Sequence, residues 1–484
     1  MLGVTYFLGL ILAAFGLVYA LPIGCSLVNG DGLWSKFLLC ATLTVLTGLL
    51  LSAATFRHRR ELKPRDGFML VTLGWVLLPV SATLPLLMSI PGLTFTRALF
   101  EAMSGLTTTG STVLTGLDSL APSLNFWRES LTWVGGLTGI VVAMGVMPLL
   151  GVGGMQLYKA EAPGPVKDER LEPRITEAVR SVWLVYVLLT VAGIAGLRLS
   201  GMSWFDAFCH TFSAVSLGGF STHDAGIGYF HSAVVEAVLM ALMLAASLNF
   251  TRHFVALRRL TLKPYSNDPE FKAMAVLLVV SIAFIAAMLA AEGVYPTFNM
   301  ALRYAAFNVI SMATTTGWVS TGHVSFSAWP VFAPIWMLFL SGIVCSTGTS
   351  GGGIKMFRTL VLVRQASREL KMLVHPSAVA PVRIGGRPIP ERAADAVLAF
   401  IFLYFMAVAL LLFAMLLTGM DFDSAFRIVV ASINNTACGL PGQGGWNLHA
   451  LNAVQIWICT VAMLFGRLEI FSLIVLFTRT FWRK

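Results

Sequence analysis

Two Thr-Thr-Thr-Gly motifs, at 107–110 and 314–317, carry oxygen atoms and backbone suited to binding a dehydrated cation. Threonine adds a hydroxyl oxygen to its carbonyl, and glycine permits conformations in which carbonyl oxygens point toward a shared axis. Rings of backbone carbonyls can replace the hydration shell of an ion, and a potassium filter takes one TVGYG-type strand from each of four units. One such motif would indicate only a polar turn. Two of them predict parts of a cation-selective filter.

Each motif lies in a longer segment, and two further segments of the chain align with these without gaps. The four segments read FTRALFEAMSGLTTTGST (95–112), WFDAFCHTFSAVSLGGFS (204–221), LRYAAFNVISMATTTGWV (302–319) and FDSAFRIVVASINNTACG (422–439). They share three columns: Ala98, Ala207, Ala305 and Ala425; Ser104, Ser213, Ser311 and Ala431; Gly110, Gly219, Gly317 and Ala437. Several shared columns indicate an internal repeat.

The repeat predicts four equivalent three-residue stretches that bind K⁺, which we call the filter segments. They are Thr108, Thr109 and Gly110; Leu217, Gly218 and Gly219; Thr315, Thr316 and Gly317; and Asn435, Thr436 and Ala437. The first and third match a carbonyl filter well, the second less closely and the fourth least.

The elements that position these segments are membrane spans. The chain is 57% hydrophobic and only 12% charged, with a mean hydropathy of +0.80, whereas soluble domains carry about 25% charged residues. Runs long enough to cross a bilayer predict ten spans, at about 2–22, 36–56, 67–90, 130–156, 181–200, 232–251, 273–291, 328–363 (interrupted), 395–419 and 453–478. The first run lacks a basic start and a cleavage site, so we interpret it as a retained span rather than a signal peptide.

The four repeat segments fall between spans 3 and 4, 5 and 6, 7 and 8, and 9 and 10. Each begins with an apolar stretch too short to cross and then breaks into small polar residues. Non-helical backbone at membrane depth survives only when it is buried in protein or lines water. We therefore expect an all-α membrane protein with two leading helices and four helix–pore loop–helix repeats, arranged with pseudo-fourfold symmetry around one pore. The predicted units are 1–60, 61–160, 161–265, 266–375 and 376–484.

The net charge of +10 follows the membrane topology. Of the 33 Lys and Arg residues, 26 lie in the stretches 57–65, 159–180, 252–272, 355–392 and 479–484. With alternating spans these stretches share one face, which the positive-inside rule assigns to the cytoplasm. An even number of spans then puts both termini in the cytoplasm. The charge needs no nucleic acid to explain it.

The eighth span contains a glycine-rich break, in FLSGIVCSTGTSGGGIKMFR. So many glycines cannot form a stable helix at mid-membrane. The stretch superficially matches a phosphate-binding GxxxxGK[ST] motif, but Ile354 precedes Lys355 and Met356 follows it. We therefore predict no nucleotide site in this chain.

Arg467 and several acidic residues are the remaining charges of interest. An arginine inside a membrane costs at least about 2.5 kcal/mol, so Arg467 is either a functional pore charge or half of a structural salt bridge with Glu469. Glu236 in span 6 could lie near an interface. Six carboxylates are expected near the outer mouth, either concentrating cations or simply solvated: Glu101, Asp118, Asp206, Asp224, Asp421 and Asp423.

An enzyme is not expected. The six cysteines are scattered without CxxC spacing, which argues against disulfides and zinc sites. The eight histidines lie mostly outside the spans, and neither HExxH nor GxSxG occurs.

The motifs TTTGST, SLGGFSTHD and TTTGWVSTG, with the four imperfect filter repeats, resemble the Trk/Ktr/HKT superfamily of potassium transporters. The extra helix pair before the first repeat makes the chain most similar to the TrkH-type bacterial subunit, and the resemblance covers essentially the whole chain. It implies K⁺ transport across the bacterial inner membrane, with Rb⁺ and Na⁺ as further candidate ions. It also implies a homodimer and a cytoplasmic, TrkA-like nucleotide-binding regulatory subunit.

The resemblance also assigns a gate beneath the filter. In the family the segment that matches the glycine-rich break is an intramembrane loop that gates the pore, and an arginine in a GRLE context lines the pore nearby. Here the gate would comprise Cys345, Ser346, Thr347, Gly348, Thr349, Ser350, Gly351, Gly352 and Gly353, with Arg467 as the pore charge. A passive kink is the alternative for this loop.

One departure from the family concerns the fourth repeat, which usually reads NN-x-GPG and here has alanine at Ala437. This puts the strictness of K⁺ over Na⁺ selection in question. The expected function is potassium uptake through a channel-like pore with an intramembrane gate. The alternative is a Na⁺- or H⁺-coupled symporter that works by alternating access, for which the chain has few midplane carboxylates.

Overall fold

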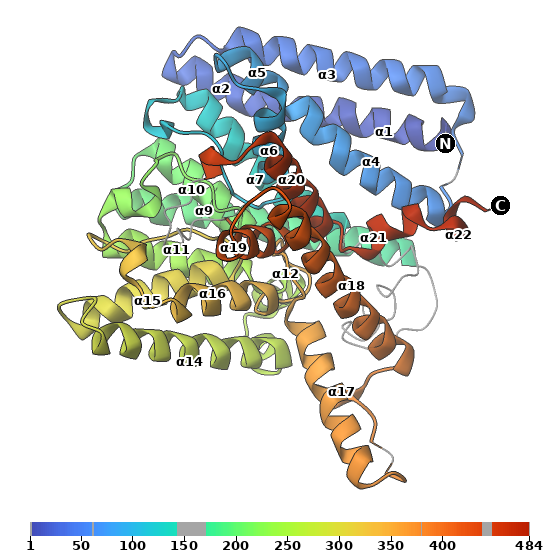
Figure 1. The fold of residues 1–484 in the computed structure, drawn as a ribbon. Coiled ribbons are helices and arrows are strands. Elements are labelled where there is room, and N and C mark those ends of the chain that lie inside the picture. Colours follow the sequence, from blue (N-terminus) through green and yellow to red (C-terminus); the bar gives the residue numbers. More distant parts are fainter. Residues whose placement is uncertain (1, 61, 143–170, 379, 438–447, 484) are drawn as a thin grey trace.

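The computed structural model describes residues 2–60, 62–142, 171–378, 380–437 and 448–483. These residues form helices and their connections, apart from one short antiparallel hairpin of β1 (Arg383–Ile384) and β2 (Arg387–Pro388). The expectation of an all-α membrane protein is confirmed. Figure 1 shows the helices gathered in one bundle, from which α17 projects.

The leading unit comprises α1 (Leu2–Phe15), α2 (Ala20–Asn29) and α3 (Trp34–Thr55). Helices α1 and α3 lie side by side (Figure 1) and approach closely where both carry glycine. A Cβ atom added to Gly48 would lie 2.6 Å from the carbonyl oxygen of Gly9. Small residues allow membrane helices to pack backbone against backbone, which compensates for the absence of a hydrophobic driving force in lipid.

The rest of the chain repeats one theme, in which a long helix precedes a short buried helix and a returning helix. The first group contains α4 (Pro64–Ala82), α5 (Leu84–Ser89), α6 (Phe95–Leu106) and α7 (Pro122–Val141). The second contains α9 (Leu171–Leu199), α10 (Trp204–Ser216), α11 (Ala233–Ala246), α12 (Phe250–Arg259) and α13 (Lys263–Ser266). The third contains α14 (Pro269–Ala291), α15 (Phe298–Ala313), α16 (Phe332–Ile343) and α17 (Met356–Val374), and the fourth α18 (Glu391–Leu416), α19 (Phe422–Ile433), α20 (Ala453–Arg467), α21 (Phe471–Ile474) and α22 (Arg479–Trp482).

The short helices α6, α10, α15 and α19, which we call the pore helices, start where the sequence provides a cap. A side-chain oxygen just before each helix accepts a backbone N–H of its first turn, from Thr94, Ser203, Thr297 and Asp421 respectively. Such caps satisfy donors that have no partner within the helix. The shared alanine column is fully buried in all four pore helices. A larger side chain in this column would therefore have to displace the atoms packed around it.

Two of the predicted spans are bent rather than continuous. The pair α11 and α12 bends by 99°, and the pair formed by α20 and residues 471–477 bends by 105°. The sequence predicted unbroken spans at 232–251 and 453–478, and both predictions were wrong. At the first break, the Asn249 side chain accepts the Thr251 N–H and starts α12 in a new direction. At the second, Glu469 adopts a φ of 47°, which ends the helix.

The remaining eight predicted spans have three different outcomes. Six helices within the described ranges are long and apolar enough to cross a membrane: Leu2–Asn29, Trp34–His58, Arg65–Ser89, Glu177–Leu199, Pro269–Ala291 and Glu391–Leu416. The predicted span 328–363 is interrupted between α16 and α17, as expected. The predicted span 130–156 begins in α7 and continues into 143–170, which lie outside the described residues, as does most of the basic stretch 159–180.

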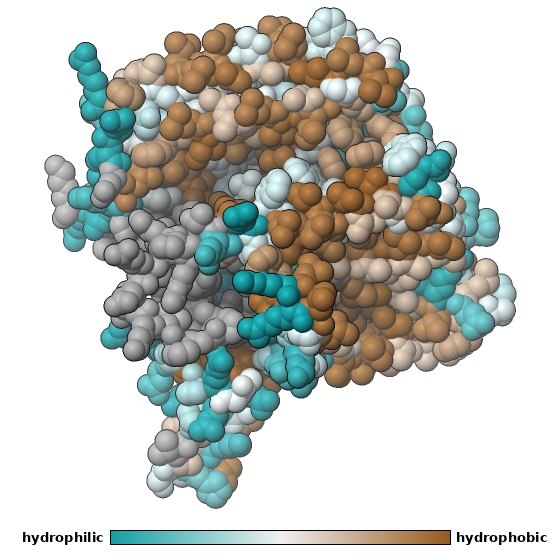
Figure 2. Space-filling view, turned by 180° about the vertical axis from the view of Figure 1, so that it is seen from behind, coloured by the Kyte–Doolittle hydropathy of each residue, from teal (hydrophilic) through white to brown (hydrophobic). Residues whose placement is uncertain are grey.

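The surface matches a membrane setting. Figure 2 shows hydrophobic side chains over most of the bundle, whereas hydrophilic side chains gather at its ends and on the projecting part of the molecule. Large apolar side chains on the long helices are exposed, including Leu50, Val279 and Phe402. Water would disfavour such a surface, but lipid does not.

Candidate functional site

Each pore helix ends with the same backbone turn, which leads into a filter segment. An N–H of the filter segment donates to a carbonyl near the helix end: Thr109 to Ser104 (2.8 Å), Gly218 to Ser213 (2.7 Å), Thr316 to Ser311 (3.0 Å) and Thr436 to Ala431 (2.9 Å). The accepting residues form the serine column of the sequence repeat. Because the acceptor is a main-chain carbonyl, alanine at 431 serves as well as serine.

The filter segments share an unusual backbone conformation. Positive φ angles occur at their first residues, Thr108 (56°), Leu217 (57°), Thr315 (65°) and Asn435 (50°), and at the glycines Gly110 (72°), Gly219 (75°) and Gly317 (80°). Positive φ is uncommon for residues other than glycine. Four of the eight such residues in the described ranges occupy this one repeat position, so the conformation belongs to the repeat and not to any one sequence.

The four filter segments meet in a closed ring. A Cβ on Gly110 would overlap the carbonyl oxygen of Gly218, and one on Gly219 would overlap that of Thr316. A Cβ on Gly317 would lie 2.6 Å from the backbone N of Ala437. The ring closes where the Asn435 side chain donates to the Thr109 hydroxyl at 3.1 Å. All twelve residues are buried, so the structure brings the predicted filter residues together.

The glycine-rich break between α16 and α17 forms a compact loop that returns to its own start. The N–H of Ile354 donates to the carbonyl of Gly342 at 2.6 Å, and the N–H of Met356 donates to that of Cys345 at 2.8 Å. The excursion between these bonds, residues 345–353, contains the predicted gate residues, and we call it the glycine loop.

The glycine loop lies directly against the filter segments. The Ser350 carbonyl accepts a long bond of 3.5 Å from the Thr108 hydroxyl. A Cβ on Gly351 would lie 3.1 Å from the Thr315 hydroxyl, and one on Gly352 would overlap the carbonyl of Asn434. Glycine is required at 352 because any side chain there would enter the fourth repeat. The loop therefore contacts three of the four repeats at the end of the filter.

Residues of the second and third groups hold the far side of the glycine loop. The carboxylate of Glu270, at the start of α14, accepts the Thr347 N–H at 3.0 Å and its hydroxyl at 3.1 Å. The Asn249 side chain donates to the Thr347 carbonyl at 2.9 Å. Neither Asn249 nor Glu270 belongs to a motif or repeat column of the sequence. Both look like ordinary helix-start residues in the sequence, and only the fold brings them to the loop.

Arg467 links the glycine loop to two other parts of the structure. Its guanidinium donates to the Ser350 carbonyl at 2.6 Å, to the Gly135 carbonyl of α7 at 2.6 Å and to the Thr108 hydroxyl at 3.2 Å. It also lies 5.3 Å from the centre of the Trp75 ring. The arginine thus touches the loop, a filter segment and α7 at once.

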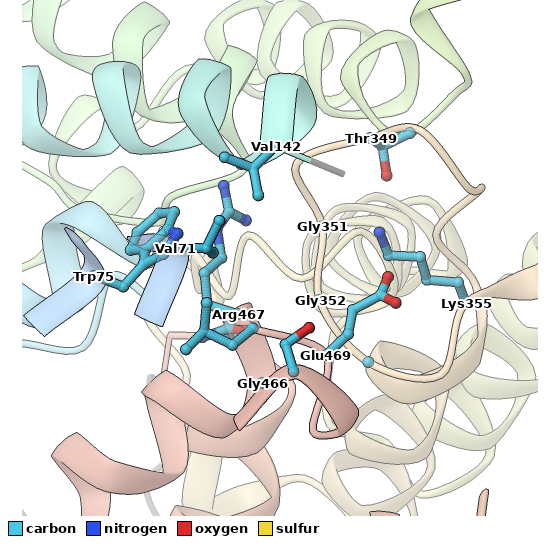
Figure 3. A pocket seen from close by; sticks show the side chains of 15 residues that line it. Val71, Trp75, Val142, Thr349, Gly351, Gly352, Lys355, Gly466, Arg467 and Glu469 are labelled. Carbon is cyan, nitrogen blue, oxygen red and sulfur yellow. The ribbon is translucent and has the colours of Figure 1, made fainter. Parts of the chain in front are cut away.

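The alternative of a salt bridge between Arg467 and Glu469 is wrong. Glu469 instead pairs with Arg358 of α17 at 2.6 Å. The bend after α20 turns the two neighbouring side chains apart, as Figure 3 shows, with Lys355 close to Glu469. Arg467, Glu469 and Lys355 line a cavity of about 40 Å³ beside the glycine loop, which is large enough for water or one small ion.

The six carboxylates predicted near the outer mouth differ in their surroundings. Glu101 is fully buried and pairs with Arg128 at 2.8 Å, so its assignment as a mouth carboxylate was wrong. Asp118 is exposed and pairs with His223 at 2.5 Å, and this hydrogen bond lowers the pKa of Asp118 below its usual value. Asp224, Asp421 and Asp423 are exposed, and Asp206 is half-buried.

Glu236, which the sequence suggested could lie near an interface, has its partners defined by the fold. The side chain is buried, pairs with Arg303 of α15 at 2.7 Å and accepts the Ser320 hydroxyl at 2.6 Å. It therefore connects α11 of the second group to the pore helix of the third. Sequence alone could not find this partner, because 67 residues separate the two charges.

Known proteins share this architecture and sequence. The family model TrkH, described as a cation transport protein, matches residues 35–484. The chain is 42% identical over 483 residues to the Trk system potassium uptake protein TrkH of Salmonella typhimurium, covering 100% of this chain and 99% of that protein. It is 37% identical over 425 residues to TrkG of Escherichia coli, covering 88% and 87% of the two chains.

A solved structure agrees with these relatives. The crystal structure of the potassium transporter TrkH from Vibrio parahaemolyticus superposes with a TM-score of 0.91 at 38% identity, covering 100% of this chain and 99% of that one. The relatives are named as transporters and not as enzymes. With the family model matching most of the chain, the protein belongs to the TrkH family of cation transport proteins.

Proposed function

We propose that this chain takes up potassium through a channel-like pore, with the four filter segments as its K⁺-selective site. The closed ring of buried filter segments is the observation that carries this proposal. Positive φ on both sides of a central residue changes the direction of successive carbonyls. This is the local geometry by which a short strand can turn several oxygens toward one axis. The naming of full-length relatives as potassium uptake proteins supports the choice of ion.

We further propose that the glycine loop is the gate and that Arg467 holds it closed. Direct contacts of the loop with the end of the filter support this assignment, and most of its tethers are hydrogen bonds that can be exchanged for water. Because Ile354 and Met356 bond back to residues 342 and 345, removing residues 346–352 should leave the flanking helices joined. Such a deletion should raise ion flux without any partner. Unchanged flux would reject the gate and favour a passive kink.

The filter proposal is tested by Gly317→Ser in proteoliposomes, measuring fluxes of K⁺, Rb⁺, Na⁺ and Li⁺. Gly317 has a φ of 80° and no room for a Cβ beside Ala437, so the substitution should displace the third and fourth filter segments. We expect K⁺ and Rb⁺ to pass preferentially in the wild type and the variant to lose that preference.

Gly293→Ser is the matched control for this experiment. Gly293 belongs to the same repeat and has a φ of 66°, but nothing lies within 4 Å of its would-be Cβ. The Gly293→Ser substitution should therefore lower the stability of the protein somewhat and leave its ion selectivity unchanged. A Gly317→Ser protein as selective as the wild type would contradict the filter assignment.

One observation favours the alternative of ion-coupled transport. Glu129 of α7 is fully buried, and neither of its carboxylate oxygens has a hydrogen-bond partner of normal geometry among the described residues. Buried carboxylates of this kind carry protons in coupled transporters. If K⁺ uptake is coupled to H⁺ here, Glu129→Gln should abolish uptake driven by a pH gradient. A pore predicts uptake that follows the K⁺ gradient alone and is indifferent to this substitution.

Assembly and orientation belong to the same proposal. We propose a homodimer in the bacterial inner membrane with both termini in the cytoplasm, where a TrkA-like nucleotide-binding subunit docks. The basic residues of α12, α13 and α17, including Arg258, Arg259 and Lys371, would face this partner. Reversing the charge of Arg258 and Arg259 together should then weaken capture of the regulatory subunit without changing partner-free flux.

A further inference from the structure

The pore helices carry another equivalent column, three residues after the shared alanine, which we call the brace column. It holds Glu101, His210, Asn308 and Ile428, one in each repeat. The three polar members are fully buried. Buried polar side chains are costly unless they are hydrogen-bonded, so their partners indicate what the column does.

In the first and third repeats the brace column bonds the strand that leaves the filter. The Glu101 carboxylate accepts the Thr112 hydroxyl at 2.6 Å and the Val113 N–H at 3.1 Å. The Asn308 amide accepts the Ser320 N–H at 3.2 Å and donates to the Ser320 carbonyl at 2.5 Å. Val113 and Ser320 both stand three residues beyond a filter glycine. Two different side chains thus hold the same backbone position.

The second repeat uses a third side chain for the same task. His210 lies 3.0 Å from the Ser221 hydroxyl, and Ser221 occupies the same repeat position as Thr112. The other ring nitrogen of His210 lies 2.9 Å from the Asp206 carbonyl. A carbonyl can only accept, so that nitrogen carries the proton and the first accepts from Ser221. A neutral imidazole satisfies both contacts.

The fourth repeat lacks this contact, because Ile428 has neither donor nor acceptor. It is also the repeat with alanine in place of the filter glycine. The two differences occur together in one segment of the ring, and the residues that follow Ala437 lie outside the described part of the chain.

We propose that Glu101, His210 and Asn308 are positioning residues that hold the outgoing strand of three filter segments against their pore helices, and so determine ion selectivity. This inference rests on the proposed function, since it concerns the shape of the proposed filter. The fourth segment has no polar residue in this column. Its Asn435 side chain instead donates to the Thr109 hydroxyl and to the Met463 carbonyl of α20. Selectivity therefore depends on the three braced segments.

The first brace also extends to the next repeat. Arg128 pairs with Glu101 at 2.8 Å, donates to the Ser221 carbonyl at 3.3 Å and lies 4.3 Å from the centre of the Phe220 ring. Truncating either partner would leave a buried charge uncompensated and could prevent folding. Asn308 is the better test, because its loss removes hydrogen bonds without leaving a charge.

The experiment compares K⁺ and Na⁺ fluxes of Asn308→Ala with the wild type in proteoliposomes, alongside thermal unfolding in detergent. The substitution removes the two hydrogen bonds to Ser320 and a third to the Tyr304 carbonyl of the same helix. Loss of the two bonds to the outgoing strand should reduce the ratio of K⁺ to Na⁺ flux about fivefold or more. Ser320→Ala is the matched control, because it removes the bond to Glu236 but keeps both backbone groups that Asn308 contacts. Ile428→Val is a second control in the same column. Both controls should keep the wild-type ratio.

Asn308→Asp tests positioning through the pH dependence of ion selectivity, which would not change if Asn308 had a merely structural role. A protonated carboxyl keeps one donor and one acceptor toward Ser320, although it cannot also donate to the Tyr304 carbonyl as the amide does. The ionised form would face the Ser320 carbonyl with a negative charge. Selectivity of this variant should therefore be poor at high pH and recover as pH falls, while the wild-type ratio changes little. This variant also decides the matter if Asn308→Ala does not fold.

The outcomes separate the two proposals. A wild-type protein without K⁺ preference would overturn the proposed function itself. A selective wild type, together with an Asn308→Ala variant of equal selectivity, would overturn only the brace. Equal loss of all fluxes without a change in their ratio would also reject it, because that result indicates a general packing defect.

Discussion

Replacing Arg467 with alanine should open the pathway in the absence of any partner. The arginine makes one direct bond to the glycine loop, at 2.6 Å to the Ser350 carbonyl. A hydrogen bond to a charged group contributes about 1.5–3 kcal/mol. If this bond exists only in the closed state, its loss shifts the closed-to-open ratio by about 10- to 150-fold. Flux through a mostly closed pathway should rise by a similar factor.

The assay is uptake of K⁺ or Rb⁺ into proteoliposomes containing the full chain alone. Arg467→Lys separates two explanations, because lysine keeps the charge but cannot reproduce the three contacts of the guanidinium fork. If the arginine acts as a latch, both variants should leak. If it acts only as an electrostatic barrier, the lysine variant should behave like the wild type.

Arg368→Ala is the control for loss of an arginine. Arg368 pairs with the exposed Glu391 at 3.2 Å and lies outside the glycine loop. The ion flux of the Arg368→Ala variant should therefore match that of the wild type. The reasoning is refuted if Arg467→Ala remains folded, as judged by its thermal unfolding, and conducts no more than the wild type.

Three other predictions follow from particular contacts. Thr347→Val removes the hydroxyl bond to Glu270 but keeps the N–H bond. Ion flux without a partner should therefore rise several-fold, but less than for Arg467→Ala. If flux does not rise, this tether does not hold the glycine loop. Gly48→Leu places a side chain where α1 and α3 touch. It should destabilise the protein by about 1–3 kcal/mol, which would appear as a lower melting temperature. Gly74→Leu is the control, because nothing lies within 4 Å of its would-be Cβ, and its melting temperature should not fall. The pKa of Asp118 is lowered by its hydrogen bond with His223, so the stabilising effect of this carboxylate is complete above the ordinary carboxyl pKa and is lost as pH falls through the lowered value. Asp118→Asn should therefore lower the melting temperature at pH 7, and the difference from the wild type should shrink as the pH falls through that lowered value.

Local features of the sequence account for the elements of the fold. The long apolar runs predict spans, capping residues such as Ser203 and Asp421 mark the starts of pore helices, and the aligned alanine and glycine columns mark the repeats. The glycine-rich stretch at 342–353 predicts a broken helix in the eighth span, and the structure breaks there. These features can be predicted because helix formation, capping and chain breaking depend on residues within a few positions of one another.

The bends after α11 and α20 could not be predicted in this way. A hydropathy window of about 19 residues averages over a break of three or four. Residues 247–249 and 468–470 are not rich in glycine or proline. The direction of the chain after each break is set by the loop and helices that the break contacts. At the first break, for example, the Ser247 carbonyl accepts the N–H of Ser346 in the glycine loop at 3.2 Å.

The sequence by itself determined that four equivalent short segments interrupt a membrane protein, and which residues lie in each. Only the tertiary structure decided the partners of the buried charges: Glu101 with Arg128, Glu236 with Arg303, and Arg358 with Glu469. A charge inside a membrane protein must be compensated, but the compensating group can come from any helix. Which helices become neighbours depends on how all of them pack together, and no stretch of sequence contains that information.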